Sequence, residues 1–341
     1  MKKIYFLLAI LLVIGITSCK KNDGMIDPPA PVDPPKPYIS DNSFKVVAYF
    51  PSYRDPNGIA DAKYKMITHL FYAFLNPNTD GSLASLEQPS RFAAVMQKAK
   101  ANGVKTGISV SGTRSIFVEM AASASARKLF VKNVLSFART NNLDGVDMDW
   151  EYPSTADGSA DNYVLLIKEL SDSLHKYNKF LSAAITPGVY AGSIRDGLKS
   201  EVFPSVDFFN IMVYDGIGWD KDEPVQHASY NMAVASLNYW MGTRGMPKEK
   251  VVLGIPAYGK NAANASKAYR DLVTANADVN LDYATLEGVQ YYFNGILTTK
   301  KKAKLAKETA NGIMFWEFYH DDNGSKSIIR AANDELGRNY N

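Results

Sequence analysis

The sequence predicts an α/β fold of the closed (β/α)8 type, the TIM barrel, and three observations lead to this prediction. Eight short segments of the 341-residue chain are apolar or alternate between apolar and polar residues, as strands do. Segments with the periodicity of amphipathic helices lie between most of them. The first apolar segment continues into Pro51-Ser52-Tyr53, whereas the first strand of an open, doubly wound sheet is followed by a glycine-rich turn.

The strands are expected at residues 44–50, 66–74, 104–110, 143–151, 180–186, 206–214, 250–258 and 312–318. Between them, helices are expected at residues 91–101, 128–137 and 163–174, where apolar side chains recur at helical spacing. Strands that alternate with helices pair in parallel through right-handed crossovers, so eight such units can close into a barrel. In such a barrel the functional residues lie at the C-terminal ends of the strands.

The N-terminal 18 residues have the pattern of a secretory signal peptide. Lys2 and Lys3 precede an apolar run from Ile4 to Ile16, which is shorter than the ~20 residues that a membrane-spanning helix needs. The run ends in Ile16-Thr17-Ser18-Cys19, which resembles the lipobox of bacterial lipoproteins. That resemblance implies cleavage before Cys19, the only cysteine of the chain, and attachment of lipid to it.

A linker is expected at residues 19–42, between the lipidated cysteine and the folded domain. Residues 27–38 contain six prolines, which favour an extended and semi-rigid chain. The catalytic barrel is then expected at residues 43–341. Together these features predict an exported protein that is lipid-anchored at a bacterial membrane or cell surface.

Four acidic residues stand within eight positions of the fourth expected strand, at Asp144, Asp147, Asp149 and Glu151. Because alternate residues of a strand share a face, the last three acids point one way and the apolar residues between them point the other. The apolar face suits the surrounding helices, so the three acids are expected inside the barrel. Burial and mutual repulsion raise the pKa of carboxyl groups, and a Glu151 with a raised pKa is what a general acid requires.

Other uses of these acids have less support from the sequence. Inward carboxylates can pair with Lys or Arg or can bind a hard cation, but no basic residue interrupts this strand. The four histidines, at positions 69, 175, 227 and 320, show no H-x-x-H or H-E-x-x-H spacing, so no metal site is expected. The net charge is only +3, without a basic stripe, which does not favour a nucleic-acid partner.

The segment DGVDMDWE at 144–151 resembles the D-x-x-D-x-D-x-E motif of family 18 glycoside hydrolases, the chitinase family. All four acid positions match, Gly145 follows the first acid, and Tyr152-Pro153 is similar to the chitinase branch. The segment KTGISVSG resembles the family's third-strand motif through Lys105, Ser109 and Gly112, with Ser111 where the first of two glycines is usual. Further resemblances are MVYD at 212–215, GIPAYG at 254–259 and GIMFWEF at 312–318, so the similarity spans residues 44–336.

The resemblance implies substrate-assisted hydrolysis with retention, in which the substrate's own 2-acetamido group is the nucleophile. Glu151 would then be the general acid and base, Asp149 would hold the acetamido N–H, Asp147 would orient Asp149, and Tyr214 would hold the acetamido oxygen. Substrate contacts are implied for a further set of residues: Asp215, Trp316, Trp219, Tyr49, Tyr258 and Met212. The mechanism requires a glycan that contains N-acetylglucosamine and needs no cofactor.

More than one function is compatible with this resemblance. We predict a chitinase that cleaves β-1,4-linked N-acetylglucosamine polymers or oligomers; the alternatives are an endo-β-N-acetylglucosaminidase for N-glycans and a chitinase-like sugar-binding protein without activity. Many members of the family carry an extra α+β module between strands seven and eight. Here only about fifty residues separate Tyr258 from Gly312, and residues 281–296 and 299–308 look helical. We therefore expect no such module and a shallow groove with endo-type cleavage or short substrates. A monomer is expected as well.

Overall fold

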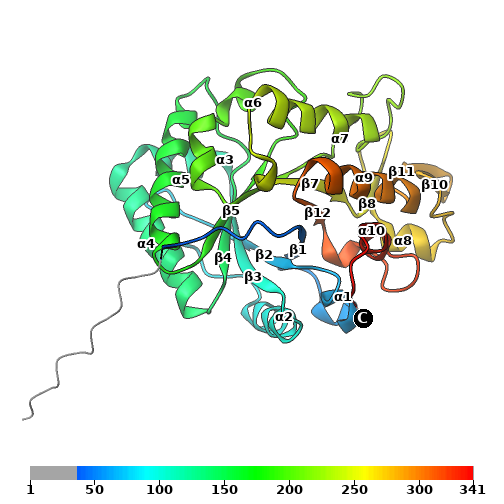
Figure 1. Cartoon of the computed structure of the whole chain (residues 1–341), viewed down its shortest axis with the longest axis horizontal. Coiled ribbons are helices and arrows are strands. Elements are labelled where there is room, and N and C mark those ends of the chain that lie inside the picture. Colours follow the sequence, from blue (N-terminus) through cyan, green and yellow to red (C-terminus); the bar gives the residue numbers. More distant parts are fainter. Residues whose placement is uncertain (1–36, 341) are drawn as a thin grey trace, which may run out of the picture. The chain divides into compact units, whose positions relative to one another are not determined.

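The computed structural model describes residues 37–340, and these form a closed barrel of eight parallel strands (Figure 1). The strands follow one another around the barrel in chain order, and the last strand pairs with the first through Lys45 and Gly312. The predicted barrel is therefore confirmed. The expected signal peptide and Cys19 lie outside the described residues.

All eight expected strands are present at or near the expected positions. They are β1 (Lys45–Pro51), β2 (His69–Leu75), β3 (Lys105–Ser111), β4 (Gly145–Asp149), β5 (Phe180–Ile185), β6 (Phe208–Ile211), β7 (Val251–Pro256) and β12 (Gly312–Trp316). The strands are almost completely buried, because one face of each strand packs inside the barrel and the helices cover the other face.

Helices surround the barrel and bury their apolar faces against it. They are α1 (Asp61–Tyr64), α2 (Pro89–Ala101), α3 (Arg114–Ala122), α4 (Ala124–Thr140), α5 (Ser159–His175), α6 (Ser193–Gly197), α7 (Tyr230–Leu237), α9 (Ile296–Thr309) and α10 (Ile328–Leu336). Short 3₁₀ turns lie at Pro56–Gly58, Ser200–Ser205, Lys248–Lys250 and Phe318–His320, and a π turn at Asn238–Thr243. Ser123 and Ser327 cap the N-termini of α4 and α10, because their hydroxyls accept hydrogen bonds from the backbone of the first turn.

The apolar side chains form two separate clusters, one between strands and helices and one inside the barrel. The interior cluster includes the rings of Phe71, Phe180 and Phe208. Gly145 makes room for one of these rings, because a Cβ at this position would lie 2.3 Å from the Phe180 ring. The motif glycine at the start of β4 is thus required by packing inside the barrel.

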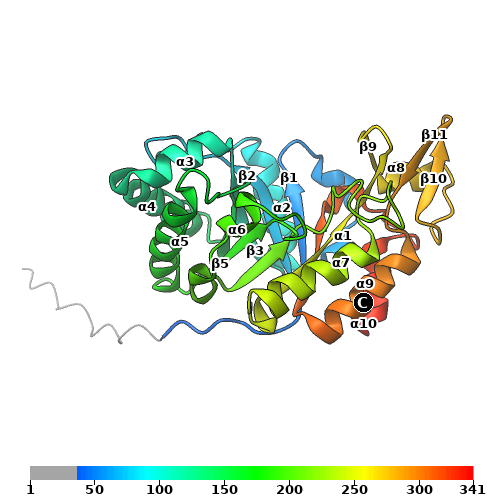
Figure 2. The same cartoon turned by 90° about the horizontal axis from the view of Figure 1, so that it is seen from above.

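A small α+β module is inserted between β7 and α9, so the expectation that no such module is present is wrong. It consists of β8 (Tyr258–Asn261), β9 (Ser266–Ala268), α8 (Tyr269–Thr274), β10 (Tyr283–Leu286) and β11 (Val289–Tyr292). The strands form an antiparallel sheet in the order β10-β11-β8-β9. Figures 1 and 2 both show this module on the opposite side of the barrel from α4 and α5.

Most of the segment expected to be a helix at residues 281–296 is the β10–β11 hairpin of this module. Its turn is formed by Glu287 and Gly288, which both have positive φ, as the tight turns of two-residue hairpins require. The flanking residues include Thr285, Val289 and Tyr291, which are good strand formers. The expected helix at 299–308 is confirmed as part of α9.

The compact unit begins at Tyr38, upstream of the expected boundary at Ser43. The Tyr38 ring stacks on His175 with 3.9 Å between ring centroids, and Ser40 donates a hydrogen bond to Asp207. Asp41 pairs with Lys105 at the first residue of β3. This short N-terminal arm therefore packs against the N-terminal end of the barrel, and the last residues assigned to the linker belong to the folded unit.

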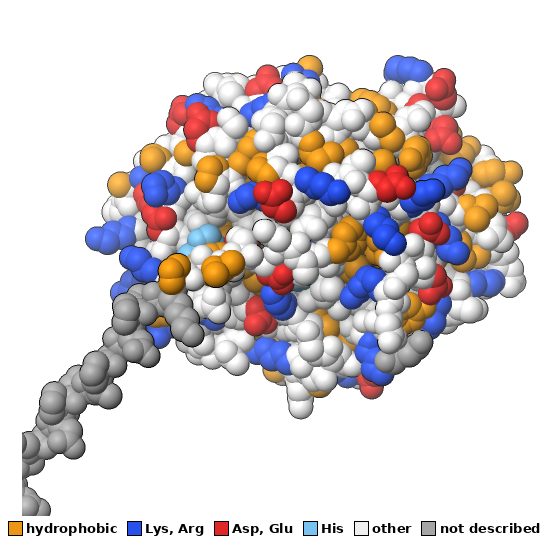
Figure 3. Space-filling view, viewed as in Figure 1, with side chains coloured by type: hydrophobic (Ala, Val, Ile, Leu, Met, Phe, Trp, Pro, Cys, Tyr) orange, Lys and Arg blue, Asp and Glu red, His pale blue; other side chains and the backbone are white. Residues whose placement is uncertain are grey.

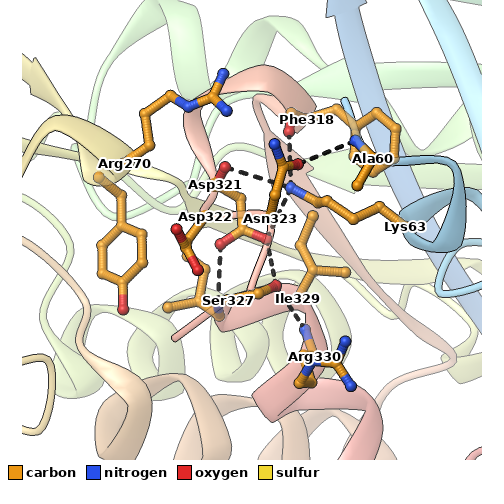
Figure 4. A network of polar contacts seen from close by, with 12 residues as sticks. Ala60, Lys63, Arg270, Phe318, Asp321, Asp322, Asn323, Ser327, Ile329 and Arg330 are labelled. Atoms are coloured by element: carbon orange, nitrogen blue, oxygen red, sulfur yellow. Dashed lines mark hydrogen bonds and ion pairs between the residues drawn. The ribbon is translucent and has the colours of Figure 1, made fainter. Parts of the chain in front are cut away.

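The loop that follows β12 is tied to α1 by a buried ion pair between Lys63 and Asp321 (Figure 4). The Lys63 Nζ atom lies 3.1 Å from an Asp321 carboxylate oxygen, and both side chains are fully buried. Lys63 also donates to the carbonyl of Phe318, and Asp321 accepts from Ser327 and from the Ile328 N–H. One network thus joins α1, the loop after β12 and the start of α10.

Replacing Lys63 with Met should destabilise the fold by about 3–5 kcal/mol, because it leaves a buried carboxylate without its cation. Chemical denaturation of the purified protein measures this change. The control is Lys98→Met, which breaks the exposed Lys98–Asp61 pair of 2.9 Å. That variant should lose no more than about 1 kcal/mol. Equal losses in the two variants would contradict a special role for the buried pair.

Candidate active site

A pocket opens at the C-terminal ends of the barrel strands, where the sequence predicted the functional residues. Its lining consists of Tyr49, Phe74, Ser111, Asp149, Glu151, Tyr152, Ala184, Pro187, Met212, Tyr214, Asp215, Tyr258, Met314 and Trp316. The fold thus brings together eight of the predicted residues: Tyr49, Asp149, Glu151, Met212, Tyr214, Asp215, Tyr258 and Trp316. They come from loops and strands that are far apart in the sequence.

The residues of β4 alternate as expected. Val146, Met148 and Trp150 pack outside the barrel, where the Trp150 ring stacks on Phe117 with 5.2 Å between centroids. Asp147 and Asp149 are buried. Asp144 lies before the strand, away from the pocket, and accepts hydrogen bonds from the backbone N–H and hydroxyl of Thr106 at 2.7 and 3.0 Å. Its role is therefore to hold the start of β4 beside β3.

Asp147 is completely buried and accepts four hydrogen bonds from four different strands. Tyr49 and Ser109 donate to one carboxylate oxygen at 2.9 and 2.8 Å. Ser182 and Asn210 donate to the other at 2.6 and 3.2 Å. Burial raises the pKa of Asp147, and these hydrogen bonds oppose the shift because they stabilise the ionised form.

Asp149 has a contrasting environment, although it lies on the same face of the same strand. One of its carboxylate oxygens is buried without a hydrogen-bond partner. Burial, and then the negative charges of Glu151 and Asp147, raise its pKa well above the ordinary value. Asp149 therefore favours the protonated form, while its neighbour Asp147 is surrounded by donors.

Glu151 follows β4 and is exposed at the mouth of the pocket. Partial enclosure of its carboxyl group by the pocket is the largest influence on its pKa and raises it. A hydrogen bond with Tyr152 acts in the opposite direction, and the negative charge of Asp215 adds to the increase. A carboxyl group in this state can donate a proton closer to neutral pH than an ordinary glutamate.

Asp215 carries a stable negative charge on the other side of the pocket. Tyr258 donates to its Oδ1 at 2.6 Å, and the Nζ atom of Lys260 lies 2.7 Å from the same oxygen. Burial alone would raise the pKa of Asp215, but hydrogen bonds with His227, Lys260 and Tyr258 outweigh it and hold the pKa well below the usual range. Two of these partners, Tyr258 and Lys260, come from β8 of the inserted module.

Aromatic rings form an apolar part of the pocket. Trp316 stacks on Phe74 with 5.7 Å between centroids and an interplanar angle of 18°. Tyr49 lies 5.6 Å from Trp316, between it and the interior of the barrel. Glu317, which follows Trp316 in the sequence, is fully buried and accepts a hydrogen bond of 3.0 Å from Arg54 in the loop after β1. This contact and the Lys63–Asp321 pair both hold the loop that begins at Trp316.

The other predicted residues lie outside the pocket lining. Trp219 is half-buried and packs against the outer hydrophobic cluster. Ser109 lies beneath the pocket and acts on Asp147, and Gly145 lies at the start of β4. Gly112 follows β3, and a Cβ added there would meet its nearest neighbour, in Pro77, at 3.4 Å, which is ordinary contact. The close packing that fixes Gly145 is therefore not repeated at Gly112.

Several residues of the site were not found from the sequence. Ser182 and Asn210 interrupt apolar strands with polar side chains, and this signal could have marked them as inward partners of a buried acid. Phe74, Pro187 and Met314 are apolar and resemble core residues in the sequence. Lys260 and His227 could not be assigned, because their contact with Asp215 depends on how the inserted module is placed.

On the face shown in Figure 3, Lys and Arg side chains are interspersed with Asp and Glu. Among residues 37–340, no group of three or more His, Cys, Asp or Glu side chains is arranged to hold a metal ion.

Replacing Asp149 with Asn should stabilise the folded protein, and the gain should increase as the pH rises from about 4 to about 7. The raised pKa means that Asp149 keeps its proton in the folded protein at pH values where it has lost it in the unfolded chain. The contribution of this group to stability therefore falls as pH rises, and Asn removes that loss. Thermal unfolding at several pH values measures the effect, and a gain independent of pH would contradict the explanation.

The matched control is Asp147→Asn, which changes the neighbouring acid in the same way. Its amide nitrogen would face two of the four donors, so this variant should lose about 1–3 kcal/mol of stability.

Comparison with known proteins agrees with this geometry. Residues 45–321 match the family described as Glycosyl hydrolases family 18. The chain is 29% identical over 273 residues to Probable chitinase 10 of Drosophila melanogaster, an alignment covering 70% of this chain and 12% of that protein. It is 30% identical over 263 residues to Probable endochitinase of Caenorhabditis elegans, covering 67% of this chain and 42% of that protein.

The chain therefore spans less than half the length of these two relatives. A crystal structure of a family 18 chitinase from the chitin utilization locus of Flavobacterium johnsoniae superimposes with a TM-score of 0.73 and 26% identity, covering 86% of this chain and 94% of that one. Because the family match extends over most of the sequence and the fold agrees with it, this protein belongs to family 18 of the glycosyl hydrolases.

Proposed function

We propose that the protein is a retaining glycoside hydrolase that cleaves β-1,4-linked N-acetylglucosamine polymers or oligomers by substrate-assisted catalysis. The observation that carries the proposal is the arrangement around β4. Asp147 is held by hydrogen bonds, Asp149 has a raised pKa, and Glu151 lies at the mouth of the same pocket. The chitinases among the relatives support N-acetylglucosamine as the substrate class.

Glu151 donates a proton to the oxygen of the leaving group and later takes one from the attacking water. Its raised pKa keeps part of the population protonated above the ordinary glutamate range, which a general acid needs. Its exposure at the pocket mouth gives it access to a glycosidic oxygen and to water. The substrate's acetamido oxygen attacks the anomeric carbon, so no second carboxylate is needed as nucleophile.

Asp149 and Tyr214 hold the acetamido group. Asp149 has an unpartnered, buried carboxylate oxygen, which is available to accept the acetamido N–H. Tyr214 lines the pocket, and its pKa is raised well above the ordinary value by burial and by its neighbours, so its hydroxyl remains a donor for the acetamido oxygen. Positioning of this kind can lower a barrier by up to ~7–11 kcal/mol in ideal cases.

Trp316 provides a flat apolar surface for the sugar ring whose bond is cleaved. The indole ring of Trp316 is fixed by stacking on Phe74, and Tyr49 packs against it from the interior side of the barrel. Asp215 faces the pocket as a permanent anion and accepts hydrogen bonds from sugar hydroxyls. Because the small inserted module contributes two partners of Asp215, Tyr258 and Lys260, beside the pocket, the expectation of an open groove with endo-type cleavage loses its basis.

Replacing Glu151 with Gln should lower kcat by about 10²–10⁴-fold with little change in KM, because the amide cannot transfer a proton. Hydrolysis of chromogenic chitobioside and chitotrioside measures both constants. A control is Glu169→Gln, on α5 outside the pocket lining, which should retain activity.

The outcomes also separate the alternatives. If wild-type protein is inactive on these substrates and on longer chitin oligomers but releases N-glycans from a glycoprotein, the proposed substrate is wrong and the endoglycosidase is supported. If it cleaves neither and binds chitin oligomers, the protein is a sugar-binding member of the family.

We also propose that the protein is exported and anchored by lipid at Cys19, and that it acts as a monomer. The sequence pattern of residues 1–19 is the evidence for the anchor. The arm that begins at Tyr38 packs at the N-terminal end of the barrel, so a tether joined to it would lie away from the pocket. Among the described residues, no helix is long and apolar enough to cross a membrane.

Expression of the full chain in a bacterial host tests the anchor. The wild-type protein should incorporate labelled fatty acid and sediment with membranes, whereas Cys19→Ala should do neither. Sedimentation of both proteins with membranes would contradict attachment through this cysteine.

A further inference from the structure

The loop that follows β3 contacts the chain on both sides of Glu151. The hydroxyl of Ser111 donates a hydrogen bond of 2.9 Å to the backbone carbonyl of Asp149. The Nε atom of Arg114, at the start of α3, donates a hydrogen bond of 2.9 Å to the backbone carbonyl of Tyr152. The two carbonyls that accept these bonds bracket the dipeptide Trp150–Glu151.

Both bonds are made where the regular sheet ends. The register of β3 and β4 ends with Ser111 opposite Asp149, and β4 pairs with β5 only as far as Met148. Beyond this point the ladders with β3 and β5 no longer hold the chain, and its next backbone hydrogen bond to another segment is the one from Thr155 to Ser193. The side chains of Ser111 and Arg114 thus continue the connection between the two strands after the ladder has stopped.

Arg114 is itself held by the loop that it contacts. Its Nη2 atom lies 2.5 Å from an Asp157 carboxylate oxygen, and the other oxygen of Asp157 accepts from the N–H and hydroxyl of Ser159 at 3.1 and 2.6 Å. The guanidinium is planar and rigid, so these contacts fix its direction better than a single contact would. The loop from Glu151 to Ser159 is therefore connected to α3 at two points.

We infer that Ser111 and Arg114 are positioning residues, which fix the backbone on either side of Glu151 and so aim its carboxyl group into the pocket. The inference rests on the proposed function, because it gives these residues a role in proton transfer by Glu151. Neither residue needs to touch the scissile bond. The geometric requirement is severe, since a displacement of about 1 Å at a reacting group can reduce the rate by roughly 10²-fold.

The identity of residue 111 gives this inference a basis in the chain's own sequence. Serine stands there in place of the first of the two glycines that the motif leads one to expect. A glycine has no side chain and could not donate the bond to Asp149. The departure from the motif therefore adds a contact beside the acid and does not remove one.

The experiment compares Arg114→Ala and Ser111→Ala in two backgrounds, wild type and Glu151→Gln, with a fluorogenic chitotrioside that makes slow rates measurable. In the wild-type background we expect kcat to fall by about 10–100-fold for Arg114→Ala and less for Ser111→Ala, with KM changed by less than about threefold. In the Glu151→Gln background the same substitutions should lower kcat little further, because the carboxyl group that they position is already absent.

Arg127→Ala is the matched control. Arg127 on α4 makes the same two kinds of contact, to the Glu169 carboxylate at 3.1 Å and to the Ala121 carbonyl at 2.6 Å, but does not line the pocket. This variant should lower the melting temperature and leave kcat within about twofold of wild type. Arg114→Lys should restore part of the activity, because lysine can still donate to the carbonyl.

The possible results distinguish the positioning role from a structural role and from failure of the proposed function. Equal losses of rate in both backgrounds would overturn the inference, since they would show an effect on the fold or on binding and not on Glu151. Unchanged kcat for Arg114→Ala in an active wild-type background would overturn it as well. Inactivity of the wild type itself would instead overturn the proposed function, and the positioning role with it.

Discussion

The burial of two aspartates on the inner face of β4 is the constraint around which the site is arranged. A carboxylate removed from water costs several kcal/mol unless hydrogen bonds replace its hydration. Asp147 receives four such bonds, one each from β1, β3, β5 and β6, and so ties half of the barrel to one side chain. Asp149 receives no comparable set, and its pKa rises well above the ordinary value. The difference between two adjacent inward positions of one strand produces one carboxyl group that is surrounded by hydrogen-bond donors and one that favours its protonated form.

Side-chain contacts join several loops at the C-terminal face to one another, beyond the last hydrogen bonds of the parallel sheet. Lys63 holds Asp321, Arg54 holds Glu317, and Arg114 holds the carbonyl of Tyr152. Each of these contacts connects loops that follow neighbouring strands of the barrel. Catalytic groups must keep their positions closely to be effective, and rigid support from surrounding residues provides this. The packed barrel beneath supplies the base on which these loops are fixed.

The two ends of the barrel have separate tasks. The pocket opens at the C-terminal ends of the strands, whereas the N-terminal arm is attached beside Lys105 and Asp207, which stand at or just before the starts of β3 and β6. The chain therefore enters the barrel on the face opposite the pocket. The inserted module extends the pocket side through Tyr258 and Lys260, which hold Asp215 in its ionised form.

The sequence by itself determined the barrel, its eight strands and the inward direction of Asp147 and Asp149, because these depend on local periodicity and on the alternation of side chains along a strand. It also indicated eight residues of the pocket, through the acids of the fourth strand and through the resemblance to family 18, and the barrel brings them together because its strand ends converge at one face. Only the tertiary structure decided the module, because the Glu287–Gly288 turn converts an apparent helix into a hairpin. The partners of the acids were likewise decided by tertiary structure. Asn210, Lys260 and Arg114 lie far from their partners in the sequence, and contacts between distant segments depend on how strands and loops pack, which local patterns do not encode.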